Sequence, residues 1–205
     1  MSEEVFGRMF VPRDLEEAAL ATVRLWLPTY LAEIERQRGL DVQSIPTIGS
    51  YSTSNEFYKW NEDAIPALIA VSPGRVPRRA ERRANGQIDA WYRIGLAVIV
   101  GGADREDVRR ISGLYGAAVR GGILQHQTLG DFGAETIEWT DERFTDIPNE
   151  QQRTLGSVQE FFEVLVPNVA NWRLGRLVPE PDPYADVTDP DVVSAEVEVQ
   201  LEEAT

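Results

Sequence analysis

The chain has 205 residues, of which 42% are hydrophobic. This length and composition fit one folded domain with terminal extensions, and the chain is too short for two domains of ordinary size. It contains no cysteine, which excludes disulfides, thiolate metal sites, cysteine nucleophiles and iron–sulfur ligation. Its formal charge of -14 argues against a general nucleic-acid-binding protein, because neutralisation of phosphates dominates such binding.

The N-terminus begins with acidic residues, Ser2-Glu3-Glu4, and lacks the apolar core of a secretory signal. No stretch approaches the roughly twenty consecutive apolar residues of a membrane span. We therefore expect a soluble protein that is assembled inside a cell and has no membrane contact.

Apolar positions recur every three or four residues from Arg13 to Arg38, the spacing of one face of an amphipathic helix. Pro28 is expected to kink this helix or divide it, and Gly39 to end it. The stretch from Asp41 to Asp63 combines turn residues with aromatic ones, which predicts an ordered loop.

Four further segments have the apolar runs or the alternation typical of strands: Ala64–Val71, Ile88–Val100, Ala134–Phe144 and Thr154–Val166. Between the second and third, Asp104 to about Gln125 reads as a helix whose apolar stripe packs on the sheet. The predicted fold class is α/β (α+β), with a single mixed or antiparallel sheet of about four strands against two main helices. An extended arginine-rich hairpin and an acidic C-terminal tail complete it.

The corner Gly101-Gly102-Ala103-Asp104 looks like the phosphate-binding turn of a nucleotide site. It lacks the third glycine of a dinucleotide fingerprint and the Gly-Lys-Ser/Thr of a Walker A loop. Carboxylates at Asp104, Glu106 and Asp107 cap the helix, favour its dipole and occupy the space that a phosphate would need. The corner is therefore predicted to be structural, and no cofactor is expected.

No residue presents a convincing catalytic or metal-binding pattern. The single histidine, His126, lies where the second helix ends and suits a capping role, and no nucleophile motif accompanies it. Five acidic residues lie on or just after the third predicted strand: Glu135, Glu138, Asp141, Glu142 and Asp146. They lack the sharp glycine turn of a calcium-binding loop, so we interpret them as the solvent-facing side chains of this strand. We predict that the protein is not an enzyme and holds no metal.

Five arginines crowd nine consecutive positions between the first two predicted strands: Arg75, Arg78, Arg79, Arg82 and Arg83. Guanidinium groups so close together repel one another unless acidic groups meet them. Three interpretations stay open: a solvated hairpin tip, an interface with an acidic protein surface such as a neighbouring copy, and a nucleic-acid contact. We take the five arginines as candidate interface residues.

The C-terminal part differs in composition from the rest. After Arg176 there are nine acidic residues and no basic one, and Pro179 to Pro183 reads as a stiff linker. From Val193 to Leu201 apolar and polar residues alternate, so Val193, Val197 and Val199 are candidate interface residues of a strand added to another subunit. A solubilising tail without structure is the alternative. The expected organisation is an arm at 1–12, a domain at 13–178 and an acidic extension at 179–205.

Several segments resemble the tail terminator (tail completion) proteins of long-tailed bacteriophages that infect actinobacteria. The resemblance covers roughly residues 13 to 170 and is carried by packing and turn signatures rather than chemistry: Trp26–Leu31, Trp60–Asp63 leading to Pro66-Ala67, Val71–Gly74, Leu124–His126 and Glu138–Glu142. The long acidic tail departs from the family pattern and leaves its own role open.

The resemblance implies a structural virion protein, assembled in the host cytoplasm, that forms a homo-hexameric ring in the tail or neck. Such a ring would end the tail tube, contact the tail tube protein and the head–tail connector protein, and let DNA cross its lumen without specific binding. Another head-to-tail connector protein, such as a stopper or joining subunit, is the alternative. A hydrolase or nucleotide-binding enzyme is the remaining one.

Overall fold

In the computed structural model, residues 10–53, 64–78, 80–84, 86–147 and 154–171 are described. They belong to one compact unit that spans Met1–Gly175. No helix among them is long and apolar enough to cross a membrane. The predicted interface residues Val193, Val197 and Val199, and also Arg79, lie outside the described residues.

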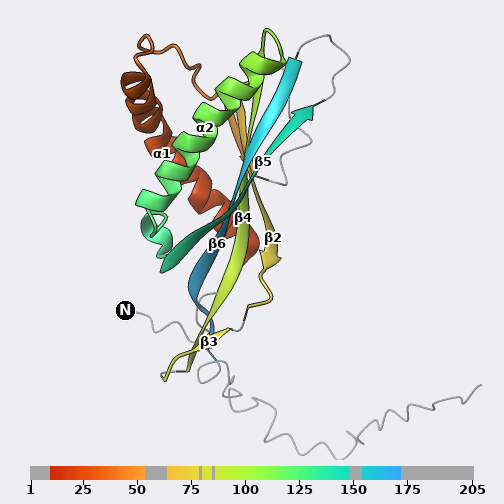
Figure 1. Cartoon of the computed structure of the whole chain (residues 1–205). Coiled ribbons are helices and arrows are strands. Elements are labelled where there is room, and N and C mark those ends of the chain that lie inside the picture. Colours follow the sequence, from red (N-terminus) through yellow and green to blue (C-terminus); the bar gives the residue numbers. More distant parts are fainter. Residues whose placement is uncertain (1–9, 54–63, 79, 85, 148–153, 172–205) are drawn as a thin grey trace, which may run out of the picture. The chain divides into compact units, whose positions relative to one another are not determined.

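A mixed sheet of six strands forms the centre of this unit (Figure 1). Five strands follow the order β1-β2-β4-β6-β5, and β3 pairs with β4. All neighbours are antiparallel except β1 and β2, which are parallel. The strands are β1 (Ser50–Thr53), β2 (Ala67–Arg75), β3 (Glu81–Arg82), β4 (Gln87–Gly102), β5 (Thr136–Ile147) and β6 (Thr154–Asn171).

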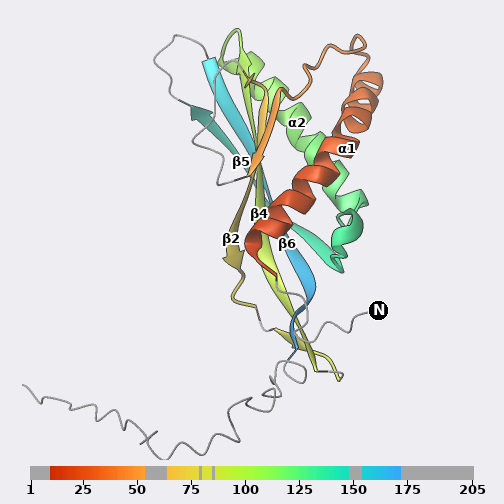
Figure 2. The ribbon, with the colours of Figure 1, turned by 180° about the vertical axis from the view of Figure 1, so that it is seen from behind.

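Two helices, α1 (Pro12–Arg38) and α2 (Arg105–Gln125), lie on the same side of the sheet, as Figures 1 and 2 show from opposite views. α1 runs through Pro28 as one continuous helix, so it does not divide there, and Gly39 ends it in the left-handed conformation. α2 begins as expected, because the Asp104 carboxylate accepts a hydrogen bond from the Asp107 N–H at 2.8 Å. A short 3-10 turn, η3 (Gly130–Phe132), follows α2.

The register of β4 and β6 decides which side chains meet the helices. Ile94 pairs with Phe162 and Val98 with Val158, and all four are buried in the core beneath α1 and α2. The alternate positions of both strands point to the other side, where a smaller buried cluster forms from Val76, Trp91 and Leu165. The helices therefore cover one face of the sheet, and the second face has a different set of side chains.

The predicted fold class is confirmed, but the expected number of about four strands was too low. β1 lies in the segment that was expected to be a loop, and β3 lies within the arginine hairpin. Neither has a repeating apolar pattern: β1 is Ser-Tyr-Ser-Thr and β3 is only Glu-Arg. Both exist because a longer neighbour supplies the hydrogen-bonding partner, a tertiary effect that local propensity does not reveal.

The packing of α2 on the sheet predicts opposite effects for two alanine substitutions. A Cβ at Gly116 would lie 2.9 Å from Val158 Cγ2 and 2.8 Å from Glu160 Oε1, whereas a Cβ at Gly113 meets nothing within 4 Å. We expect Gly116→Ala to destabilise the fold by about 1–3 kcal/mol through overpacking, and Gly113→Ala to stabilise it by about 0.5–1 kcal/mol through helix propensity.

Chemical denaturation of the two variants and the parent protein measures both effects. Equal effects of the two substitutions would contradict the close approach of α2 to β6.

Candidate functional site

The arginine hairpin connects β2 with β4, and four of its five arginines are described. Arg75 is the last residue of β2, Arg82 lies in β3, and Arg78 and Arg83 follow these two strands. All four are exposed. The hairpin between β2 and β4 therefore forms as expected, and carboxylates of the same chain contact some of its arginines.

Arg78 lies on the face of the sheet that the helices leave uncovered. Its Nη2 is 2.9 Å from Glu138 Oε2 on β5, and its Nε is 2.8 Å from Glu163 Oε2 on β6. Its guanidinium carbon lies 4.7 Å from the ring centroid of Trp91 on β4, within cation–π range. Arg93 also reaches Glu163, at 2.9 Å. Arg78 thus connects the hairpin to β4, β5 and β6. The pKa of its guanidinium is raised, mainly by the hydrogen bond with Glu138.

Arg83 makes a second set of contacts within the chain. Its Nε lies 2.5 Å from Oδ2 of Asp89, whose side chain is only 1% exposed, and its Nη2 pairs with Glu135. The other Asp89 oxygen accepts the Asn168 N–H at 2.8 Å. Arg83 is therefore the cation that compensates a buried carboxylate.

The hairpin arginines thus separate into two groups. Arg78 and Arg83 are met by carboxylates of their own chain, which reduces the mutual repulsion that suggested an outside partner. Arg75 donates to the Arg78 carbonyl at 3.3 Å, and no carboxylate in the described part of the chain pairs with Arg82. An interface role for the hairpin stays a prediction, and Arg82 is the residue most available for it.

The acidic residues of β5 and the segment before it are each paired with an arginine. The pairs are Glu135–Arg83, Glu138–Arg78, Asp141–Arg143, Glu142–Arg120 and Asp146–Arg105. Among the described residues, no group of three or more His, Cys, Asp or Glu side chains could hold a metal ion. The acidic side chains of β5 and its flanking segment therefore form ion pairs with arginines in addition to facing solvent.

The sequence reading missed a buried carboxylate, Glu160, in the middle of β6. It is fully buried on the helix-covered face, next to Gly116 of α2. Trp139 Nε1 donates to its Oε2 at 2.7 Å, and Arg120 Nη1 lies 3.3 Å from its Oε1 and 3.2 Å from Glu142. The available signal was the position of Glu160 between Val158 and Phe162, which places it on the apolar side of an alternating strand.

Burial raises the pKa of Glu160 from its usual 4.5 to about 8, and the hydrogen bond with Glu142 acts in the same direction. Arg120 and the Trp139 indole favour the charged form and oppose the shift. At neutral pH the carboxyl group of Glu160 is therefore largely protonated and able to share its proton with Glu142.

His126 occupies the C-cap of α2, as expected. Its ring stacks on Trp26 of α1 with centroids 4.1 Å apart and an interplanar angle of 11°, and the Tyr30 hydroxyl lies 3.5 Å from its Nε2. Beside it, an open groove of about 760 Å³ runs along α1. The contacts of His126 join the end of α2 to the middle of α1, which is a structural role.

No protein-family model and no curated protein sequence matches the chain. Among solved structures, one chain of the "Virion of native gene transfer agent (GTA) particle" matches with a TM-score of 0.39 and 10% sequence identity. The match covers 67% of this chain and 93% of that chain. At this identity and TM-score, the similarity carries no conclusion about function.

The raised pKa of Glu160 predicts a pH-dependent stability that Glu160→Gln removes. Below pH 4.5 the carboxyl is protonated in both the folded and the unfolded chain. Between pH 4.5 and about 8 the unfolded chain loses this proton while the folded chain keeps it, so the free energy of unfolding falls as the pH rises. We expect the melting temperature of the parent protein to fall across this range relative to that of Glu160→Gln.

Melting curves of both proteins at pH 5, 6, 7 and 8 measure the difference. A parallel pH dependence of the two proteins would contradict the buried, protonated carboxyl.

Arg82 and Arg83 are neighbours, and the structure predicts different consequences of replacing them. Arg83→Ser leaves the buried Asp89 carboxylate without its cation, which we expect to destabilise the fold by about 1–3 kcal/mol. Arg82→Ser removes an exposed guanidinium, and surface changes of this kind usually stay within about 0.5 kcal/mol. Urea denaturation at low and moderate salt distinguishes the two cases. A larger loss for Arg82→Ser would contradict the assignment of Asp89 to Arg83.

Proposed function

We propose that this chain is a structural virion protein that assembles as a closed homo-hexameric ring, ends the tail tube of a long-tailed bacteriophage and joins it to the head-proximal neck. The proposal is supported by the resemblance of the segments Trp26–Leu31, Val71–Gly74 and Glu138–Glu142 to tail terminator proteins. The proposed role is mechanical and uses no catalytic centre.

The single observation that supports the proposal best is that the two helices cover only one face of the sheet and leave the other face open. α1 and α2 bury one face, and the other face carries a shallow, mostly apolar groove of about 310 Å³ whose lining includes Val71, Ala97 and Phe161. Val71 is 41% exposed in this groove. Exposed apolar surface of this kind suits a protein–protein contact.

A closed ring requires two unlike surfaces on each subunit, because a heterologous contact joins one patch to a different patch of the next copy. The outer side of the helix layer and the open face of the sheet are two such surfaces. We propose that the groove around Val71 contributes to the contact between subunits. The partners of the finished ring would be the tail tube protein on one side and the head–tail connector protein on the other.

DNA would cross the lumen of the proposed ring during packaging or ejection. The net charge of -14 disfavours adhesion of the phosphate backbone to such a ring. No specific DNA contact is part of the proposal.

Substitution of Val71 tests the subunit contact. Val71→Glu places a charge in the groove at an exposed position, so we expect monomers in native mass spectrometry and a melting temperature close to that of the unassembled parent protein, because loss of the ring removes only the stabilisation that assembly adds. Val42→Glu is the matched control, because Val42 is 86% exposed in the segment after α1. Rings of Val71→Glu as stable as those of the control would contradict the proposed contact.

Depletion of the protein in the phage tests the function itself. We expect overlong or unfinished tail tubes and filled heads without tails, both corrected by the parent gene and left uncorrected by Val71→Glu. Tails of normal length with capped ends beside unjoined heads would favour the connector alternative instead.

A further inference from the structure

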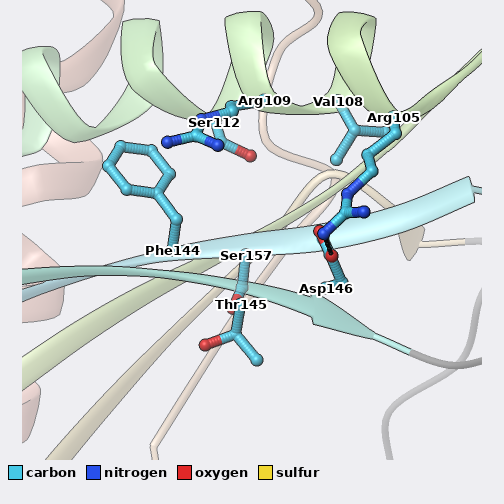
Figure 3. A pocket seen from close by; sticks show the side chains of 9 residues that line it. Arg105, Val108, Arg109, Ser112, Phe144, Thr145, Asp146 and Ser157 are labelled. Carbon is cyan, nitrogen blue, oxygen red and sulfur yellow. Dashed lines mark ion pairs between the residues drawn. The ribbon is translucent and has the colours of Figure 1, made fainter.

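A small polar pocket lies between the N-terminal half of α2 and the strands β5 and β6 (Figure 3). Its volume is about 150 Å³. Figure 3 shows the side chains of Arg109 and Ser112 on the helix side of the pocket and the side chain of Phe144 rising from the sheet towards them. This pocket is separate from the arginine hairpin and from the groove around Val71.

Two donors of the pocket are available for a ligand. Ser112 is 2% exposed, and its buried hydroxyl has no hydrogen-bond partner among the described residues. The guanidinium of Arg109 lies 5.9 Å from the Phe144 ring, and no carboxylate in the described ranges pairs with it. Arg105, one helical turn away, is instead engaged by Asp146. A buried donor without an acceptor is costly, so an acceptor group entering this pocket would satisfy the Ser112 hydroxyl, and the exposed guanidinium of Arg109 would add a charged donor beside it.

The donors fit a single carboxylate. A guanidinium offers two parallel N–H groups that match the two oxygens of a carboxylate, and the Ser112 hydroxyl can donate to one of them. Arg105, Arg109 and Asp146 together leave one net positive charge at the pocket. That charge balances one carboxylate, and the neighbouring Asp146 opposes a more highly charged anion.

The chain itself has a source of such carboxylates. After Arg176 it contains nine acidic residues and no basic one, and in the alternating segment Val193–Leu201 Glu196 and Glu198 share one side. β5 is the edge of the described sheet beside the pocket, and an edge strand offers unpaired N–H and C=O groups to an added strand. A strand on β5 would place every second side chain next to Phe144 and Arg109.

We propose that this pocket receives a carboxylate, from Glu196 or Glu198, when the acidic C-terminal segment of a neighbouring copy adds a strand to β5. The proposal rests on the proposed ring, because it needs a neighbour. Ser157, which lines the pocket, and Asn171, the last residue of β6, are fourteen residues apart, or about 46 Å along the strand. The C-terminal segment follows Asn171 at one end of β6, and the pocket lies near Ser157 at the other end. The segment of one copy can therefore reach the pocket of the next copy through a heterologous contact.

Disulfide trapping tests the proposal cleanly, because the chain has no cysteine of its own. Phe144→Cys is mixed with Ser194→Cys or Gln200→Cys, each in the full-length chain, and oxidised. These two tail positions share the side of Glu196 and Glu198, so both acids and Arg109 stay in place. We expect a disulfide-linked dimer of two different variants from at least one mixture, with Val197→Cys, on the opposite side, as the low-yield control.

Substitution of the donors gives a second readout. Ser112→Ala removes a buried hydroxyl that no described residue of its own chain pairs with, so we expect the unassembled protein to melt at the same or a higher temperature. The same variant, and Arg109→Gln, should lower the yield of the trapped dimer at least several-fold, and Arg110→Gln should not. Arg110 is the matched control because its partner is Asp107 on the same helix.

The outcomes separate this inference from the proposed ring. A ring in native mass spectrometry without trapped dimers overturns the docking and leaves the ring intact, whereas a monomer overturns both. A disulfide formed only within one chain, when Phe144→Cys and Gln200→Cys are combined, overturns the contact between copies. Binding of short duplex DNA that Arg109→Gln abolishes would assign the pocket to phosphate instead.

Discussion

The antiparallel register of β4 and β6 is the constraint on which the rest of the structure depends. It pairs Leu96 with Glu160 on the helix-covered face and Arg93 with Glu163 on the other. Because side chains alternate along a strand, a slip of one residue would exchange the two faces, expose the core and bury the ion pairs. Burial of the apolar face under both helices therefore fixes the register, and the register in turn fixes where the charged groups lie.

Ion pairs between arginine and carboxylate organise the surface that this register creates. β5 and its flank supply acids, and the arginines come from the hairpin, from α2 and from β5 itself. Single surface pairs contribute little to stability, whereas removal of the cation that faces a buried acid, as Arg83 faces Asp89, leaves an uncompensated charge and is more destabilising. Arg82 in the hairpin and Arg109 on α2 are among the described arginines that no described carboxylate pairs with. Both are therefore available for recognition of another chain.

Apolar runs and periodicity in the sequence were sufficient to predict both helices and the four long strands, most of which bury several apolar side chains. β5 is the exception, because Ile137 is its only buried residue and Trp139 and Phe144 are exposed. These patterns did not predict β1 or β3, which depend on a longer neighbour for their hydrogen bonds. The ion pairs of Arg78 with Glu138 and Glu163 could not be predicted from local sequence patterns either, because the two acids lie 60 and 85 positions after Arg78 in the chain. The position of Glu160 between Val158 and Phe162 could have placed it on the apolar face, but its complete burial depends on the close approach of Gly116, which only the packed helix reveals. The predicted interface valines lie outside the described residues and stay a prediction.

The proposed assembly connects these features: a sheet covered on one side, a groove on its open face and a pocket beside its edge strand are surfaces that a ring of identical copies could use. Cryo-electron microscopy of the intact virion, with this fold fitted to the neck, tests that claim most directly. The account predicts six copies in one closed ring at the head-proximal end of the tail tube, with the groove around Val71 buried between neighbouring copies. Density for the fold elsewhere in the particle, or a ring in which that groove faces solvent, would contradict it.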